Sequence, residues 1–172
     1  MKKLLKVLLF VGVVTVTFSD MAIYNPTGSI QLLQTRRSSE NIRFYRDNRS
    51  QRQNSISRRK SKSIEIFEGN RRRRPIYNAR LVNDAPRVYL GANMGNTVYH
   101  SRIAHTGEVL IYKRSGLRNN VANYKRIGNE ILVYDSRKKE RKNIIARVRM
   151  GDYDYNDKEI LVSLIQSGVL PL

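Results

Sequence analysis

The chain of 172 residues contains no cysteine. A disulfide framework, a thiolate metal site and a cysteine-linked lipid anchor near the N-terminus are therefore excluded, and the fold must be held by packing alone. The sequence also lacks a glycine-rich phosphate loop, a Ser-His-Asp arrangement with recognisable spacing and a cluster of metal-ligating residues. We therefore expect no metal and no cofactor.

Acidic residues are scarce. There are 14 Asp and Glu against 33 Lys and Arg, and the formal net charge is +19. A charge of this size makes polyanions the first partners to consider, because it attracts them over long distances. Nucleic acid, acidic lipid head groups and anionic cell-surface polymers offer similar electrostatics, so composition does not choose among them.

The apolar run at the N-terminus is short for a membrane span. Three lysines within the first six residues precede an apolar stretch at 8–18, whereas a spanning helix needs about 20 residues. We interpret residues 1–19 as a secretory signal, cleaved after Ser19 with Thr17 as the second small residue of the site. The protein would then be secreted, periplasmic or part of the cell envelope. The alternative is an uncleaved anchor at residues 4–18, which would make this a membrane-anchored structural or envelope protein.

Residues 20–74 are expected to form a basic, largely disordered arm. Between Arg36 and Arg74 there are 14 Lys and Arg against four acids, with few large apolar groups. A segment of this composition buries too little apolar surface to offset its conformational entropy. Its densest basic runs suit phosphate contacts with occasional aromatic stacking. The predicted polyanion-binding residues are Arg58, Arg59, Lys60, Lys62, Arg71, Arg72, Arg73 and Arg74.

Residues 75–172 are expected to form a β-rich domain. Short apolar runs separated by Gly and Asn predict antiparallel strands, arranged as a meander or a small barrel-like sheet. The motif Glu-[Val/Ile]-Leu-[Ile/Val]-Tyr occurs twice, at residues 108–112 and 130–134. The repeat is short, and we interpret it as a likeness between two hairpins rather than as a duplication.

The C-terminal tail changes to the helical period. Asn156 and Glu159 have the spacing of a capping box, and Gly168 is a natural stop. We therefore predict a helix over 157–168 that covers one side of the sheet, and an acidic helix start at 151–159 that pairs with the basic arm. The apolar residues that share one face of this helix are Ile160, Leu161, Leu164 and Ile165.

A nuclease site is the alternative to binding alone. A two-residue hairpin loop after His105 would place His105 opposite Glu108 and would gather His100, Arg102 and Lys113 on one face. A histidine can move the proton of a ribose hydroxyl while Lys or Arg neutralises the transition state. The two histidines are five residues apart, however, and would point to opposite faces of one strand. We therefore favour an exported, basic, non-enzymatic protein that binds an anionic polymer or surface over an exported ribonuclease-like toxin domain.

Overall fold

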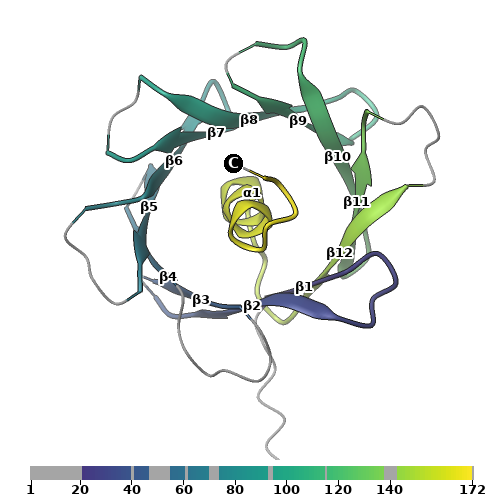
Figure 1. Cartoon of the computed structure of the whole chain (residues 1–172), viewed down its shortest axis with the longest axis horizontal. Helices are drawn as coiled ribbons and strands as arrows, with labels where there is room; N and C mark the ends of the chain where they lie inside the picture. Colours follow the sequence, from purple (N-terminus) through teal and green to yellow (C-terminus); the bar gives the residue numbers. More distant parts are fainter. Residues whose placement is uncertain are drawn as a thin grey trace, which may run out of the picture.

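The computed structural model describes residues 21–39, 41–46, 55–60, 62–69, 74–92, 95–114, 116–137 and 143–171. Within these ranges the chain forms 12 antiparallel strands and one α-helix (Figure 1). Each strand pairs with the next one along the sequence, and the last pairs with the first, so that the sheet closes into a barrel. The prediction of a mainly β protein with a C-terminal helix is confirmed.

The strands and the helix have the following bounds: β1 (Met21–Tyr24), β2 (Gln31–Arg37), β3 (Ile42–Tyr45), β4 (Ser55–Arg59), β5 (Ser63–Glu68), β6 (Tyr77–Val82), β7 (Ala85–Leu90), β8 (Thr97–Ile103), β9 (Val109–Lys113), β10 (Asn120–Ile127), β11 (Glu130–Asp135), β12 (Ile144–Met150) and α1 (Asp157–Gln166).

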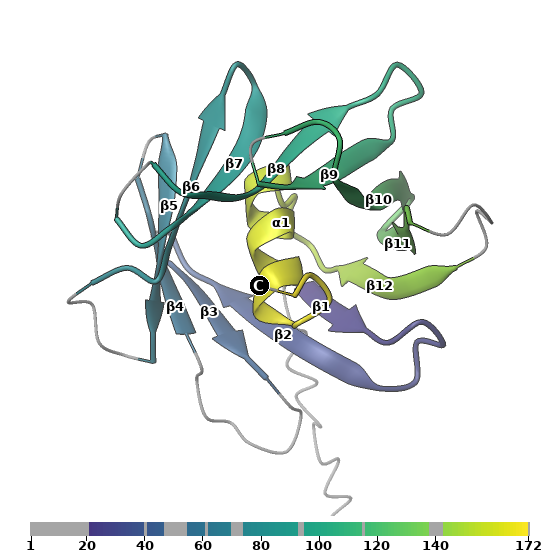
Figure 2. The same ribbon diagram turned by 45° about the horizontal axis from the view of Figure 1, so that its top comes forward.

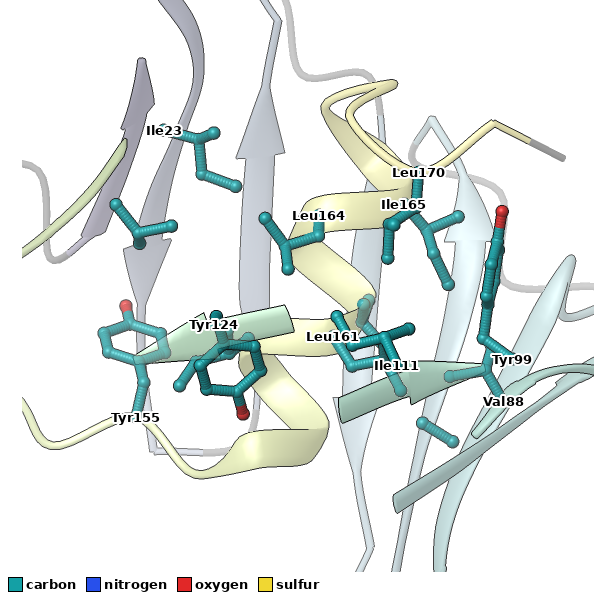
Figure 3. Close-up of a cluster of buried hydrophobic side chains, with 14 of the residues drawn as sticks. Ile23, Val88, Tyr99, Ile111, Tyr124, Tyr155, Leu161, Leu164, Ile165 and Leu170 are labelled. Atoms are coloured by element: carbon teal, nitrogen blue, oxygen red, sulfur yellow. The ribbon is translucent and has the colours of Figure 1, made fainter. Parts of the chain in front are cut away.

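The helix lies inside the barrel, as Figures 1 and 2 show from two directions. Alternate side chains of a strand point inward and outward, and the inward ones pack on α1 in one continuous core. Figure 3 shows inward residues such as Val88 and Ile111 in the same cluster as Leu161 and Leu164 of the helix. We expected α1 to cover one side of the sheet, but the closed sheet surrounds it instead.

The ends of α1 follow the sequence signals. The Asn156 side chain accepts a hydrogen bond from the Glu159 backbone N–H, and the Glu159 carboxylate accepts one from the Asn156 N–H. This capping box satisfies amide groups that a helix start leaves without partners. Gly168 has a φ of 79°, a left-handed value that suits glycine and ends the helix shortly after Gln166.

The described part of segment 20–74 is folded, which corrects the expected arm and its boundary at residue 75. Strands β1 to β5 occupy positions between residues 21 and 68 and complete the barrel. In β3 and β5 the inward residues Ile42, Phe44, Ile64 and Ile66 are spaced two apart and are buried. This period of two supplies enough buried surface to outweigh the charge carried by the outward residues.

The repeated motif marks equivalent positions in successive hairpins. Residues 108–112 lead into and form most of β9, and 130–134 form most of β11. Each motif ends in an outward tyrosine at the same end of the barrel. An aromatic residue recurs at this place on every odd-numbered strand, at intervals of 21 to 23 residues: Tyr24, Tyr45, Phe67, Tyr89, Tyr112 and Tyr134.

In the part of the chain that the structure describes, no helix is both long enough and apolar enough to cross a membrane. The predicted signal or anchor, residues 1–19, lies outside the described residues.

Candidate anion-binding surface

Two pairs of arginines face each other across neighbouring strands on the outer wall of the barrel. Arg36 of β2 lies opposite Arg43 of β3, and Arg80 of β6 lies opposite Arg87 of β7. At least one sequence neighbour of each arginine is buried on the inner side, so these four side chains point outward. The buried neighbours include Thr35, Ile42, Phe44, Ala79 and Val88. Arg36 and Arg43 are exposed, and Arg80 and Arg87 are half-buried.

Tight turns set the register of both pairs. Asn83 and Asp84 have φ values of 51° and 59°, the left-handed values that a two-residue hairpin turn requires, and this turn places Arg80 opposite Arg87. In the other hairpin the Ser38 N–H donates to the Asn41 carbonyl at 2.8 Å, which closes the connection between β2 and β3.

Like charges directly opposite each other destabilise a sheet. Among the ion pairs of the described residues, none involves Arg36, Arg43 or Arg87. The guanidinium of Arg36 lies 5.5 Å from the centre of the Tyr45 ring, and Arg80 Nε donates to the Asn78 side chain at 3.3 Å. These arginines therefore concentrate positive charge on the outer wall, most clearly at Arg36 and Arg43.

The basic residues predicted from the run at 57–62 lie in different environments. Arg58 points outward over the ring of Phe67, at 5.9 Å from the ring centre. Arg59 points inward, and its Nε lies 3.2 Å from the buried carboxylate of Glu159. The structure thus brings Arg58 to the candidate surface and gives Arg59 a role inside the barrel.

The other predicted basic residues add less to a defined surface. Lys60 Nζ lies 2.5 Å from Glu65 Oε1, so its charge is paired. Lys62 and Arg74 are exposed. The remaining three predicted residues, Arg71, Arg72 and Arg73, lie outside the described residues.

The residues of the alternative nuclease site are not brought to one face. The β8–β9 loop is one residue longer than expected, because the Ala104 N–H donates to the Glu108 carbonyl at 2.8 Å. This shifts the register by one, so that His100 faces Tyr112 and Lys113 faces Tyr99.

The register shift changes the position of each candidate group. Lys113 points inward, whereas His100 and Arg102 point outward. His105 is exposed in the loop, and Glu108 is half-buried at its end, just before the paired residues of β9. The predicted cationic face of His100, Arg102 and Lys113 is therefore wrong.

His100 has a buried environment that suits a neutral ring. Its Nδ1 lies 2.7 Å from the Arg114 carbonyl oxygen, and its ring stacks on Tyr112 with centroids 5.1 Å apart. Burial lowers the pKa of His100, the Arg114 carbonyl partly opposes this, and the charge of Arg87 lowers the pKa further. These contacts give His100 a packing role.

Sequence reasoning missed the four paired arginines. Dense runs of charge stand out at 58–62 and 71–74, whereas single arginines inside strands carry no such signal. The available clue was symmetry, since Arg80 and Arg87 lie three residues to either side of the turn residues Asn83 and Asp84. Reading those two residues as a hairpin turn would have placed the arginines opposite each other.

Comparison of the chain with protein-family models, with curated proteins and with solved structures gives no match. The functional argument therefore depends on the geometry of the chain itself.

Proposed function

We propose that the protein is exported and binds a linear anionic polymer along the outer wall of its barrel, without catalysing a reaction. The observation that carries this proposal is the pair of opposed arginine positions, Arg36 with Arg43 and Arg80 with Arg87. At Arg36 and Arg43, a phosphate or sulfate group between the two guanidinium groups would replace their repulsion with charge-assisted hydrogen bonds.

The distribution of the arginines favours a flexible polymer over a flat anionic surface. One pair lies on β2 and β3 and the other on β6 and β7, so the curvature of the barrel turns them in different directions (Figure 1). A flat surface would contact one pair at a time, whereas a flexible chain can follow the wall. Arg58 of β4 lies between the two pairs and extends the basic path.

The aromatic residues beside the path support the same function. Rings of Tyr45 and Phe67 lie under the guanidinium groups of Arg36 and Arg58. Such stacking orients a guanidinium group while leaving its N–H donors available to an anion. The path thus offers oriented donors, which suit phosphate or sulfate recognition better than mobile lysines do.

The binding test compares two double variants that remove the same net charge. Arg36→Gln/Arg43→Gln removes one opposed pair, and Lys60→Gln/Arg126→Gln removes two charges that already pair with Glu65 and Asp154. Affinities for a labelled single-stranded DNA, for heparin and for vesicles of anionic lipid are measured over a range of salt concentrations.

The first variant should bind both polymers more weakly. With single-stranded DNA, the slope of log K against log salt concentration should become shallower by roughly 0.7 for each phosphate group that the variant no longer neutralises. The control should change less. Equal effects of the two variants would contradict a defined path. Binding to vesicles but to neither polymer would contradict the proposal that the partner is a linear polymer.

Export is tested by the mass of the mature protein. Cleavage after Ser19 would give a chain beginning at Asp20 and would keep every described strand, since β1 begins at Met21. Recovery of the chain from a membrane fraction with Met1 intact would support the anchor instead.

A further inference from the structure

The end of the barrel where β9 and β10 are connected carries a second cationic feature. A cavity of about 430 Å³ is lined by Lys113, Arg114, Arg118, Asn119, Asn120, Val121 and Arg137. Its volume lies within the range of about 300–1,000 Å³ that small-molecule sites occupy. Its described lining contains four cationic residues and no acidic one.

The backbone holds these residues around the cavity. Arg114 has a left-handed φ of 64°, and its N–H donates to the Val98 carbonyl at 2.8 Å. The Lys113 N–H donates to the Asn119 carbonyl at 2.9 Å, which closes the connection between the strands. The ladder shifts register between Asn120 and Ala122, the irregularity of a β-bulge, and such bulges redirect side chains.

The cationic groups differ in how firmly they are held. Arg137 donates from Nε and Nη2 to the two carboxylate oxygens of Asp135, at 3.0 and 3.2 Å, so its guanidinium is fixed in place. Lys113 Nζ donates to the Pro171 carbonyl at 3.4 Å. Arg114 and Arg118 are exposed and form none of the ion pairs found among the described residues.

We infer that this cavity binds the phosphate group of a compact ligand. Lys113, Arg114 and Arg118 bind the phosphate, and Arg137 supplies a preoriented donor at its edge. The inference is independent of the proposed polymer binding, because it uses different residues at the end of the barrel.

The experiment uses isothermal titration of the full mature chain with ribose 5-phosphate, inorganic phosphate and ribose. Ribose 5-phosphate and inorganic phosphate should each bind saturably, and ribose should not bind measurably. Lys113→Gln/Arg118→Gln should weaken ribose 5-phosphate binding by at least about 10-fold, since two charged hydrogen-bond donors are removed.

The matched control is Arg102→Gln/Lys125→Gln, which removes the same charge from exposed positions outside both the cavity and the polymer path. It should leave ribose 5-phosphate binding unchanged, and thermal unfolding of each variant checks the fold. Absence of saturable binding by the wild type, or equal weakening by the control, would overturn the site. If the Lys113→Gln/Arg118→Gln variant does not fold, the Arg114→Gln single variant provides the same comparison. If Arg36→Gln/Arg43→Gln loses DNA and heparin binding but keeps ribose 5-phosphate binding, the cavity and the polymer path are separate sites.

Discussion

The inner and outer walls of the barrel treat polar groups differently. Inside, polar side chains near the start of α1 have specific partners: Tyr155 and Thr35 hydroxyls lie 3.0 Å apart, and Arg59 pairs with Glu159. Outside, Arg36 and Arg43 face each other, and neither takes part in an ion pair among the described residues. Stability accounts for the inner arrangement but not for the opposed arginines outside, and this difference is the basis of the proposed polymer binding.

The largest effect should follow a cavity made inside the barrel. Leu161 is completely buried on α1, and Leu161→Ala should lower the free energy of unfolding by about 2–5 kcal/mol. Ile103 at a strand end is 57% exposed, and Ile103→Ala should cost less than about 0.5 kcal/mol. Denaturant unfolding of both variants measures the contrast, and equal losses would contradict the position of α1 inside the barrel.

The next prediction uses two adjacent arginines on opposite faces of β4. Arg59→Gln leaves the buried carboxylate of Glu159 without its cation and should cost about 2 kcal/mol, less than for a fully buried pair because the Arg59 side chain is 29% exposed. Arg58→Gln should change stability by less than about 0.5 kcal/mol but weaken polyanion binding.

Denaturant unfolding and salt-dependent binding of the two variants provide the measurement. Arg59→Gln should have the larger effect on unfolding, and Arg58→Gln should have the larger effect on polyanion binding. If the same variant had the larger effect in both assays, the inner wall would not serve stability, and the outer wall binding, as distinct roles.

The fold was predictable to the extent that local patterns reported it. Asn156, Glu159 and the apolar spacing that follows them located α1, and apolar runs located most strands after residue 75. Strands β3 and β4 were missed because their outward arginines raised the local charge, although Ile42 and Phe44 kept the strand period. Closure of the barrel depends on pairing of β1 with β12, which are far apart in sequence and carry no local signal for it.

The candidate surface was less predictable than the fold. A one-residue difference in the loop after β8 reversed the side of the wall on which Lys113 was expected. Arg58 and Arg59 belong to one basic run, yet alternation sends one outward and the other to Glu159. Strand register therefore decides which basic side chains face outward and are available to a partner. The composition of the chain does not reveal this register.

A smaller effect should come from pH, through the buried ring of His100 on the outer wall. Its folded pKa is lowered by burial below the ordinary value of 6.5, so the unfolded chain binds a proton more readily. The stability that His100 contributes is fully present above about pH 6.5 and declines as the pH falls from there to the folded pKa. The slope should not exceed about 1.4 kcal/mol per pH unit for one proton.

His100→Phe keeps a ring against Tyr112 and should remove this part of the pH dependence. His105→Gln, in the exposed loop, is the control and should retain it. Unfolding measured between about pH 7 and pH 5 compares the variants on both sides of the ordinary histidine pKa. An unchanged acid slope in His100→Phe would show that other groups cause it.

The smallest effect concerns the opposed pair itself. Arg43 is exposed and lies between Arg36 and Ile56 in the ladder, so Arg43→Gln removes a repulsion and no ion pair found among the described residues. Stability should rise by about 0.2–1 kcal/mol at low salt, and the gain should shrink as salt screens the two charges. Arg43→Lys keeps the charge and should show no such gain. With heparin present the order should reverse, because the wild type then gains binding free energy that is smaller in the variant. A loss of stability in Arg43→Gln at low salt would mean that the pair is not repulsive, and the outer wall would then no longer differ from the inner wall in the way that supports polymer binding.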